Sequence, residues 1–454
     1  MARLVRSDSF FGKIQRGLGS GYLEALTRPA PEVASAVFRC LADDPRISTQ
    51  QEERDLYYAR LLLARGIDEA PIGELLARQP EVDQPGRTDR DLLPLGVLGF
   101  LARSGRPKAV GILRDYVRWG DWWSEALPLL GATGDIAAWL GLDQVLRERF
   151  PDDDDARQAL EDWWDRGEMR DAWAMQGPLA HLLVPTRKLE DPPPADLSGL
   201  TAAELLQRVV AHGPRFRNAP TDTLVGRLRA GSAPDRAVVQ AAMLGEDLAL
   251  AAQAIRVLGA VGDSAIIGPA RRILPKLDRL RSGKGPMRRA ILRGLDGLPA
   301  PDALELAREW REARGYRQII ATRLLALHAT EDDLPWVVER VRWAAKRHDS
   351  LFQYAEILRR FPGSGPFAGF EAIYCRYVPS CCRGDLVEAM SVADPSFATT
   401  LAFECLFDCE PRAREAAART VDTSIPSASA RLNELSEDPL EESDVRAASA
   451  GRLA

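Results

Sequence analysis

Histidine, the side chain that most often carries acid–base and metal chemistry at neutral pH, is scarce in this sequence. Histidine occurs only four times, and the positions are too scattered for a paired metal motif such as H-E-x-x-H. The four residues are His181, His212, His328 and His348. We interpret all of them as structural or surface residues. The sequence therefore predicts no catalytic residue, no metal site and no cofactor.

Cysteine is also sparse, and the six residues form no C-x2-C pair. Five of them fall near the C-terminus: Cys375, Cys381, Cys382, Cys405 and Cys409. One helix would place Cys405 and Cys409 on a single face, where a thiolate metal site is conceivable. We favour core packing, because free cysteine behaves as a small apolar residue between close-packed helices. Reduced thiols are expected throughout.

Long apolar segments are absent as well. The longest run, Leu92 to Ala102, spans eleven residues and contains Pro94, which is too short for a bilayer. The segment from Met1 to Arg16 has positive charges but no apolar core of an export signal. We therefore expect a cytoplasmic protein without a membrane partner.

Two short motifs lack the residues that their chemistry requires. Ser282-Gly-Lys-Gly285 resembles a phosphate-binding loop, but Asp278 occupies the place of its first glycine. The run from Asp152 to Asp155 has no calcium-loop glycine or closing glutamate. We interpret that run as a solvated turn after Pro151 that caps the next helix.

The composition is that of a folded soluble chain of 454 residues, with 46% hydrophobic and 28% charged residues. This length exceeds what one compact core usually serves, so several domains or a repeat array are expected. The net charge of -6 excludes a chain that is basic throughout but leaves a local basic patch open.

An internal repeat is the clearest positive signal. Leu130-Gly-Ala-Thr-Gly-Asp135 recurs almost unchanged as Leu258-Gly-Ala-Val-Gly-Asp263, and Leu98 lies 32 residues before Leu130. After Leu258, corresponding leucines follow at intervals of 37, 30 and 33 residues. They are Leu295, Leu325 and Leu358. A period of about 33 residues is typical of a unit of two helices.

Each unit has recognisable helix boundaries. The first helix of one unit is expected from Leu248 to Val261, with Asp247 as its cap and Gly262 as a left-handed stop. Its buried face should carry Ala251, Ala254, Ile255 and Leu258.

The second helix of that unit should run from about Ser264 to Leu274, with Asp263 as its cap. Pro269 is expected to kink it and Pro275 to end it. In later units Asp302, and Asp332 or Asp333, are expected to start the second helices.

The segment from Ala254 to Asp263 resembles HEAT repeats of the bacterial type that also occurs in phycobilin lyases. The resemblance covers about residues 88–140 and 247–350, and further worn units follow toward the C-terminus. It implies an all-α fold, a right-handed α-α superhelix in which neighbouring helix pairs stack. Such folds serve scaffolds, inhibitors and some enzymes alike, so the resemblance concerns the fold.

One break divides the chain. Residues 185–195 are rich in proline and cannot continue a helix, and Thr201 with Glu204 forms a capping box beyond them. We therefore predict an N-terminal helical lobe over 1–184, a linker over 185–195 and a C-terminal repeat lobe over 196–454. The region before about residue 85, with a helix expected from Gln50 to Ala64, has little repeat character and is interpreted as a cap.

Aromatic residues gather in the N-terminal lobe, where seven of the ten tryptophans lie between residues 119 and 173. Adjacent tryptophans on one helix point about 100° apart, so Trp163 and Trp164 are difficult to bury together. A surface with aromatic anchors and an acidic rim would suit a basic protein segment, although filling of wide core spaces is the alternative. The candidate residues are Trp122, Trp123, Trp163, Trp164, Asp162, Asp165 and Glu168.

Basic residues recur at equivalent repeat positions in the C-terminal lobe. Arg272, Arg311 and Arg342 each follow an aspartate by nine residues, and Lys276 and Lys346 follow by thirteen. Such a row along a concave wall would attract a polyanion, although glutamates on the same helices can neutralise it.

We therefore expect a non-enzymatic scaffold or adaptor that binds a protein partner. The alternative is binding of nucleic acid or another polyanion, including the role of a HEAT-like DNA glycosylase. Those enzymes combine aromatic residues, an aspartate and an arginine in one basic groove, whereas here the tryptophans lie in an acidic stretch. A role like that of phycobilin lyases is a third option and depends on the repeat type alone.

Overall fold

The computed structural model describes residues 4–49, 51–78, 90–156, 197, 199–212, 219–279 and 284–454. Within these residues the protein is helical, with 26 α-helices, 72% helix and no strand. The predicted all-α class is therefore confirmed. No helix in the described part of the chain is long and apolar enough to cross a membrane.

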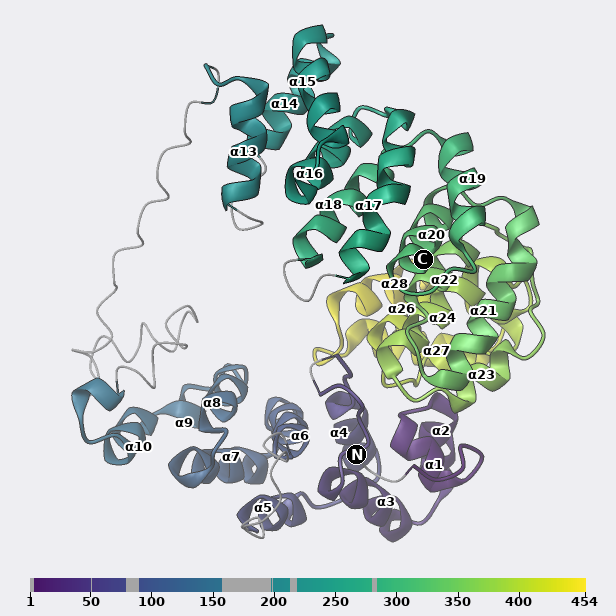
Figure 1. Ribbon diagram of the computed structural model, residues 1–454. Helices are drawn as coiled ribbons and strands as arrows, with labels where there is room; N and C mark the ends of the chain where they lie inside the picture. The colour runs from purple at the N-terminus through teal and green to yellow at the C-terminus, as the bar shows by residue number, and fades with distance from the viewer. Residues whose placement is uncertain are drawn as a thin grey trace. The chain divides into compact units, whose positions relative to one another are not determined.

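The helices belong to two compact units (Figure 1). The first unit comprises Met1–Lys188, Val341–Ala355 and Pro362–Ala454, and the second comprises Leu189–Arg340 and Glu356–Phe361. The expected linker, 185–195, lies outside the described residues. The division does not follow chain order, because the last 93 residues, 362–454, belong with the N-terminal segment instead of with the repeats that precede them.

The first unit contains helices from both ends of the chain. In its N-terminal part these are α1 (Phe10–Arg16), α2 (Gly19–Thr27), α3 (Ala30–Ala42), α4 (Asp55–Ala64), α5 (Ala70–Ala77), α6 (Leu92–Arg103), α7 (Pro107–Trp119), α8 (Trp123–Gly131), α9 (Ile136–Trp139) and α10 (Leu142–Arg149). In its C-terminal part they are α23 (Phe370–Arg376), α24 (Ser380–Ala393), α25 (Ala402–Cys405), α26 (Pro411–Thr420), α27 (Pro426–Glu437) and α28 (Ser443–Leu453), with a 3-10 turn at Phe397–Thr399.

The two ends of the chain meet inside this unit, where the purple N-terminal helices lie beside the yellow C-terminal ones (Figure 1). Helix α2 packs against α25, and α26 packs against both α24 and α28. The expected helix from Gln50 begins only at Asp55. Glu52 and Arg54, which precede it, are buried and paired instead of lying on a helix surface.

The second unit consists of consecutive helices. They are α13 (Ala202–His212), α14 (Ala219–Arg229), α15 (Ala233–Leu244), α16 (Leu248–Gly259), α17 (Ile267–Arg279), α18 (Lys284–Leu295), α19 (Ala300–Trp310) and α20 (Tyr316–His328), with 3-10 turns at Ser264–Ile266 and Glu331–Asp333. Two further helices, α21 (Leu334–Arg347) and α22 (Phe352–Leu358), have residues in both units. Helix α16 packs on α18, and α19 packs on α20.

The repeated glycine allows two helices of this unit to touch backbone to backbone. A Cβ atom at Gly259 of α16 would lie 2.0 Å from the carbonyl oxygen of Gly294 on α18, which only glycine avoids. On α16 the predicted face of Ala251, Ala254, Ile255 and Leu258 is fully buried. The Leu-Gly pair of the repeat therefore provides the helix contact.

The predicted caps of the repeats are largely confirmed. Asp247 accepts hydrogen bonds from the backbone amides of Ala249 and Leu250, at 2.8 and 3.1 Å, at the start of α16. Gly262 is left-handed, with φ of 75°, and Asp263 accepts from the amide of Ala265. Thr201 and Glu204 form the predicted capping box.

Three expected boundaries differ from the structure. Pro275 lies inside α17, which continues to Arg279, so the prediction that it ends the helix is wrong. Asp302 lies in the first turn of α19 after Pro299 and does not cap it. Asp333 is the buried third residue of a capping box begun by Thr330, so the cap is the threonine.

Candidate partner-binding surface

The predicted tryptophan cluster is only partly within the described structure. Trp163, Trp164, Asp162, Asp165 and Glu168 lie outside the described residues. Trp122 precedes α8 and is half-buried, whereas Trp123 is 8% exposed. The Trp123 ring lies 5.3 Å from that of Phe150, between ring centroids, so this residue is part of the core.

Large apolar side chains are nevertheless exposed on α7 and α9. Trp119, at the end of α7, is 47% exposed, and Ile136 and Leu140, at the two ends of α9, are 62% and 64% exposed. Sequence reasoning missed Ile136 and Leu140. The sequence feature that could have indicated them is a short apolar segment between Gly134 and Gly141, which are both left-handed. A helix of only four residues cannot bury all of its side chains, so some apolar ones stay exposed.

Hydrogen bonds hold α9 in place at both ends. Asp135 accepts from the backbone amide of Ala137 at 2.9 Å at its start. At its end the Arg114 guanidinium, on α7, donates to the carbonyl oxygens of Ala137, Ala138 and Leu140 at 2.8–3.1 Å. A cation on the last carbonyls of a helix also complements its dipole. These hydrogen bonds fix the position of α9 on α7, and with it the exposed side chains of Ile136 and Leu140.

This region carries a strong negative charge. Residues 119–156 contain two basic residues, Arg147 and Arg149, against nine acidic ones. The acidic residues are Asp121, Glu125, Asp135, Asp143, Glu148, Asp152, Asp153, Asp154 and Asp155. Arg147 is already paired with Asp153 at 2.5 Å. As predicted, Asp152 begins a turn after Pro151 and accepts from the amide of Asp154. The exposed apolar side chains thus belong to a stretch of chain with a net negative charge, which favours a basic ligand, and Arg114 of α7 is the cation at the end of α9. We call residues 119–156 the acidic surface.

The predicted basic row is partly paired with acids. Arg272 and Lys276 are exposed on α17, whereas Arg311 is half-buried and its guanidinium lies 3.6 Å from the carboxylate of Asp333. Two of the glutamates expected to neutralise the row do pair with arginines. These are Glu309 with Arg271 and Glu312 with Arg340.

Arg342 and Lys346 of that row belong to the first unit, on the end of α21. Arg342 donates to the carbonyl oxygen of Ala368 at 2.8 Å, and Lys346 is exposed. The structure therefore leaves Arg272, Lys276 and Lys346 as the most exposed cations of the predicted set.

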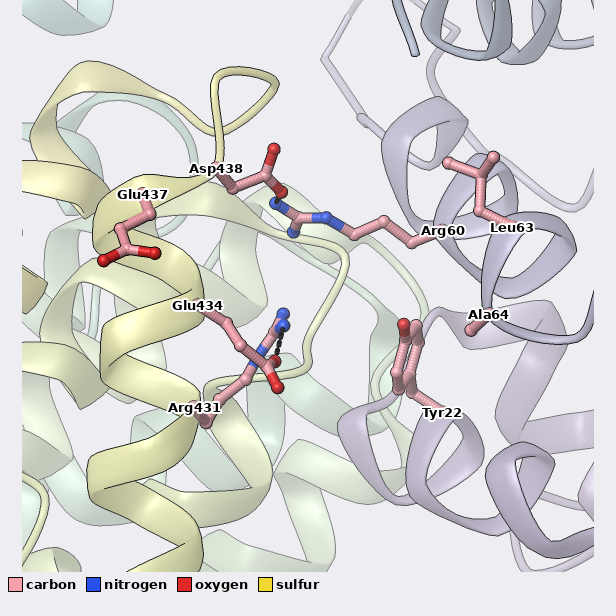
Figure 2. A pocket seen from close by; sticks show the side chains of 8 residues that line it. All are labelled: Tyr22, Arg60, Leu63, Ala64, Arg431, Glu434, Glu437 and Asp438. Atoms are coloured by element: carbon pink, nitrogen blue, oxygen red, sulfur yellow. Dashed lines mark hydrogen bonds and ion pairs between the residues drawn. The ribbon is translucent and has the colours of Figure 1, made fainter. Parts of the chain in front are cut away.

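A polar pocket of about 410 Å³ opens between α2, α4 and α27 in the first unit (Figure 2). Its lining residues are Tyr22, Arg60, Leu63, Ala64, Arg431, Glu434, Glu437 and Asp438. Figure 2 shows Arg60 reaching Asp438, while Arg431 and Glu434 face the Tyr22 ring across the opening. Nothing in the sequence pattern predicted this pocket, because its walls come from opposite ends of the chain.

Within the pocket the charged groups are mostly paired with one another. Arg431 is 8% exposed and donates to Glu434 at 2.9 Å, while its buried Nε atom has no partner. Burial lowers the pKa of Arg431, and the nearby Arg60 lowers it further. Burial raises the pKa of Tyr22. The lining contains no histidine, cysteine or serine, so these walls offer polar recognition and no ready nucleophile.

The first unit also has a buried ionic cluster, which we define by three pairs. Arg383 donates twice to Asp408, at 2.8 and 3.0 Å, Arg54 donates to Glu52 at 2.7 Å, and Arg414 donates twice to Glu441. All six side chains are at most 3% exposed. Sequence reasoning missed the cluster, because no local pattern distinguishes a buried arginine from the many exposed ones.

The pKa values of Glu441, in the cluster, and of Glu410, beside it, are shifted in opposite directions. Burial opposes the charge of Glu441, but its pairing with Arg414 outweighs that cost and lowers the pKa to about 2. For Glu410, burial and then the charge of Asp408 raise the pKa to about 7. One buried oxygen of Glu410 has no hydrogen-bond partner. Pairing, and not burial alone, therefore decides which carboxylates stay charged.

Two of the C-terminal cysteines belong to the core. Cys405 is fully buried and Cys409 is 2% exposed, as core packing requires. They do not share a helix face, because α25 ends at Cys405. Among the described residues, no group of three histidine, cysteine or acidic side chains could hold a metal ion.

Comparisons of the chain with protein-family models, with curated proteins and with solved structures found no match.

Proposed function

We propose that this protein is a non-enzymatic adaptor that binds a basic segment of a protein partner on the acidic surface. One observation carries the proposal: Trp119, Ile136 and Leu140 are exposed within a stretch of nine acidic and two basic residues. Apolar anchors supply affinity when a partner covers them, and opposite charge guides the encounter. The partner's matching feature is a segment with lysines or arginines around leucine-like side chains.

The wider assignment is also a proposal. The repeat with its Leu-Gly contact and aspartate caps supports a HEAT-like superhelix, a fold whose extended surfaces suit protein recognition. The reduced cysteines and the absence of a long apolar run support a cytoplasmic location.

Binding of a labelled amphipathic peptide of leucine and lysine, followed by fluorescence anisotropy, tests the surface directly. The double substitution Ile136→Ser and Leu140→Ser should weaken binding at least about tenfold, because it removes both anchors. Leu244→Ser is the matched control, since Leu244 is 60% exposed but lies at the end of α15 in the other unit. Equal binding by the double variant and the wild type would contradict the proposal.

The charge component is tested separately. Asp154→Asn with Asp155→Asn should reduce the association rate and its dependence on salt, while the anchors remain. A peptide of leucine and glutamate with the same apolar content should bind much more weakly. If it binds as tightly as the lysine peptide, recognition is apolar only. The natural partner can be sought by capture from a cell lysate on the immobilised protein. A candidate partner should bind the wild type and the Leu244→Ser control but not the Ile136→Ser, Leu140→Ser double variant.

Polyanion binding remains the alternative because Arg272 and Lys276 are exposed on α17. Retention on heparin at low salt that disappears in Arg272→Glu with Lys276→Glu would favour it. The peptide result is independent of this measurement.

A further inference from the structure

Two adjacent cysteines, Cys381 and Cys382, lie in the first turn of α24, a helix of 14 residues. Their sulfur atoms are 3.9 Å apart, and both side chains are half-buried, so reagents of small size can reach them. They are separate from the acidic surface and from the pocket. Neither proposal above uses them.

A loop from another part of the chain covers Cys382. The backbone turns at His348, which has a left-handed φ of 56°, and then presents Ser350, whose Oγ atom lies 4.0 Å from the Cys382 sulfur. A non-glycine residue in this conformation is uncommon and is held by its surroundings. The Tyr377 hydroxyl donates to the carbonyl oxygen of Asp349 at 2.5 Å, which fixes the loop.

Polar groups surround the Cys382 sulfur: the Cys381 thiol donates to it over 3.9 Å, and the Ser350 hydroxyl accepts from the Cys382 thiol over 4.0 Å. The hydrogen bond from the Cys381 thiol is the largest cause that lowers the pKa of Cys382, to about 6. Burial opposes this effect, and the backbone amide of Leu351 supports it. The first turn of a helix stabilises an anion in the same way. Cys375, which is similarly exposed but lacks these donors, has its pKa raised to about 11 by burial and by nearby glutamates.

Other charged groups near the pair are accounted for. Asp385 on the same helix is paired with Arg412 at 2.5 Å. Glu52 and Glu410 act on Cys381, whose pKa is raised by its hydrogen bond to Cys382 and by burial. These carboxyl groups favour the proton on Cys381, so Cys382 is the sulfur of the pair that ionises first.

We propose that Cys382 is a nucleophilic thiolate that hydroperoxides oxidise, and that Cys381 is the thiol that resolves the product. The Cys382 sulfur attacks the terminal oxygen of the hydroperoxide, the O–O bond breaks, and the leaving alkoxide takes a proton from solvent. The products are Cys382 sulfenic acid and an alcohol. Cys381 then attacks the oxidised sulfur, a disulfide forms and water leaves. Two thiols are oxidised and one hydroperoxide is reduced, so atoms and electrons balance.

The disulfide should be easily reversed. Cα atoms of neighbouring residues are about 3.8 Å apart, below the usual 4.4–6.8 Å of disulfides, so ring closure distorts the first turn of α24 and makes reduction easier. Arg383, the next residue, holds the buried pair with Asp408. Distortion of the first turn of α24 by the disulfide would therefore displace Arg383 and disturb its pair with Asp408 in the ionic cluster.

The first test is alkylation of the wild-type protein by iodoacetamide across pH, with each cysteine followed by peptide mass spectrometry. At pH 7 Cys382 should react about 30–100-fold faster than Cys375, since a larger thiolate fraction outweighs lower intrinsic nucleophilicity. Its rate should reach half its plateau near pH 6. Equal rates for Cys382 and Cys375 would overturn the proposal, and no substitution is needed for this measurement.

The second test is treatment with hydrogen peroxide. The wild type should form a Cys381–Cys382 disulfide, and Cys381→Ser should accumulate a sulfenic acid at Cys382 that dimedone traps. Cys375→Ser is the matched control and should behave as the wild type. Absence of both products while Cys382 stays reduced would overturn the oxidation step. Trapped sulfenic acid in the wild type without disulfide would overturn the role of Cys381.

Discussion

The two units bury different kinds of groups. In the first unit, six arginines are below 9% exposure, and three of them form the ionic cluster with acids that are also buried. The six are Arg16, Arg46, Arg54, Arg383, Arg414 and, beside the pocket, Arg431. Among the described residues of the second unit, no arginine is buried, and Asp333 is the one buried acid.

The second unit obtains its close packing from small residues instead. Gly259, Gly294 and Gly297 bring the backbones of α16 and α18 together, and a Cβ atom on any of them would meet a carbonyl group within 2.5 Å. The arginines of its ion pairs are 20–43% exposed, including the two that pair with the buried Asp333. Consecutive helices of a repeat meet through short connections, so geometric fit is sufficient.

The first unit differs because its helices come from opposite ends of the chain and must pair correctly with one another. Arg54 donates to the carbonyl oxygen of Val378, and Arg60 to Glu441, across more than 300 residues. A buried ion pair adds little net stability compared with apolar packing, but a mismatched partner leaves an uncompensated charge. We interpret the ionic cluster as a device that selects one pairing of the two ends.

The largest expected effect comes from breaking one buried pair. Asp408→Asn leaves the charge of Arg383 without its partner and should reduce the free energy of unfolding of the first unit by about 3–5 kcal/mol. Hydrogen exchange with mass spectrometry resolves the peptides of each unit. Faster exchange in α1, α4 and α24 with unchanged exchange in α16 and α18 is the expected result. A uniform change in both units would contradict the comparison.

A smaller effect, in the other unit, is expected from Gly259→Ala. The new methyl group would lie 2.0 Å from the Gly294 oxygen, so α16 and α18 must separate at a cost of about 2–3 kcal/mol. Gly226→Ala on α14 is the control, since nothing lies within 4 Å of its Cβ position, and it should stabilise by about 0.5–1 kcal/mol. Urea unfolding measures both. Destabilisation by the control as well would show that the helix contact is not the cause.

Glu410→Gln should act only at higher pH. The pKa of Glu410 is about 7 in the folded state, above its ordinary value of 4.5, so the folded state binds the proton more tightly than the unfolded state does. As pH rises from about 4.5 to 7, ionisation of this group therefore lowers the free energy of unfolding. At pH 8 the variant should gain about 2 kcal/mol, and at pH 5 much less. Melting temperatures at the two pH values give the comparison. An equal gain at both would indicate a packing effect and not ionisation.

The smallest effect is expected where an ion pair is exposed. Glu309 pairs with Arg271 in the second unit, and both side chains are 43% exposed. Glu309→Gln should change the free energy of unfolding by less than about 1 kcal/mol, because solvent screens the pair. A loss as large as that of Asp408→Asn would remove the distinction between the units.

Parts of both regions were predictable because they depend on neighbours in sequence. The cap by Asp247, the stop at Gly262 and the buried face around Leu258 each involve residues within one or two helical turns. Pro275 shows the limit of such reasoning, because packing on both sides of α17 tolerates a proline that ends isolated helices.

The sequence by itself determined that this protein is helical, where many of its helices begin and end, and which face of α16 is buried. Tertiary structure alone decided the exposed apolar side chains and the pocket. Among the described residues no element covers the Ile136 and Leu140 side chains, and the pocket forms where α2 and α4 meet α27. The physical reason is that burial and charge pairing depend on residues that lie close in space and hundreds of positions apart in the chain.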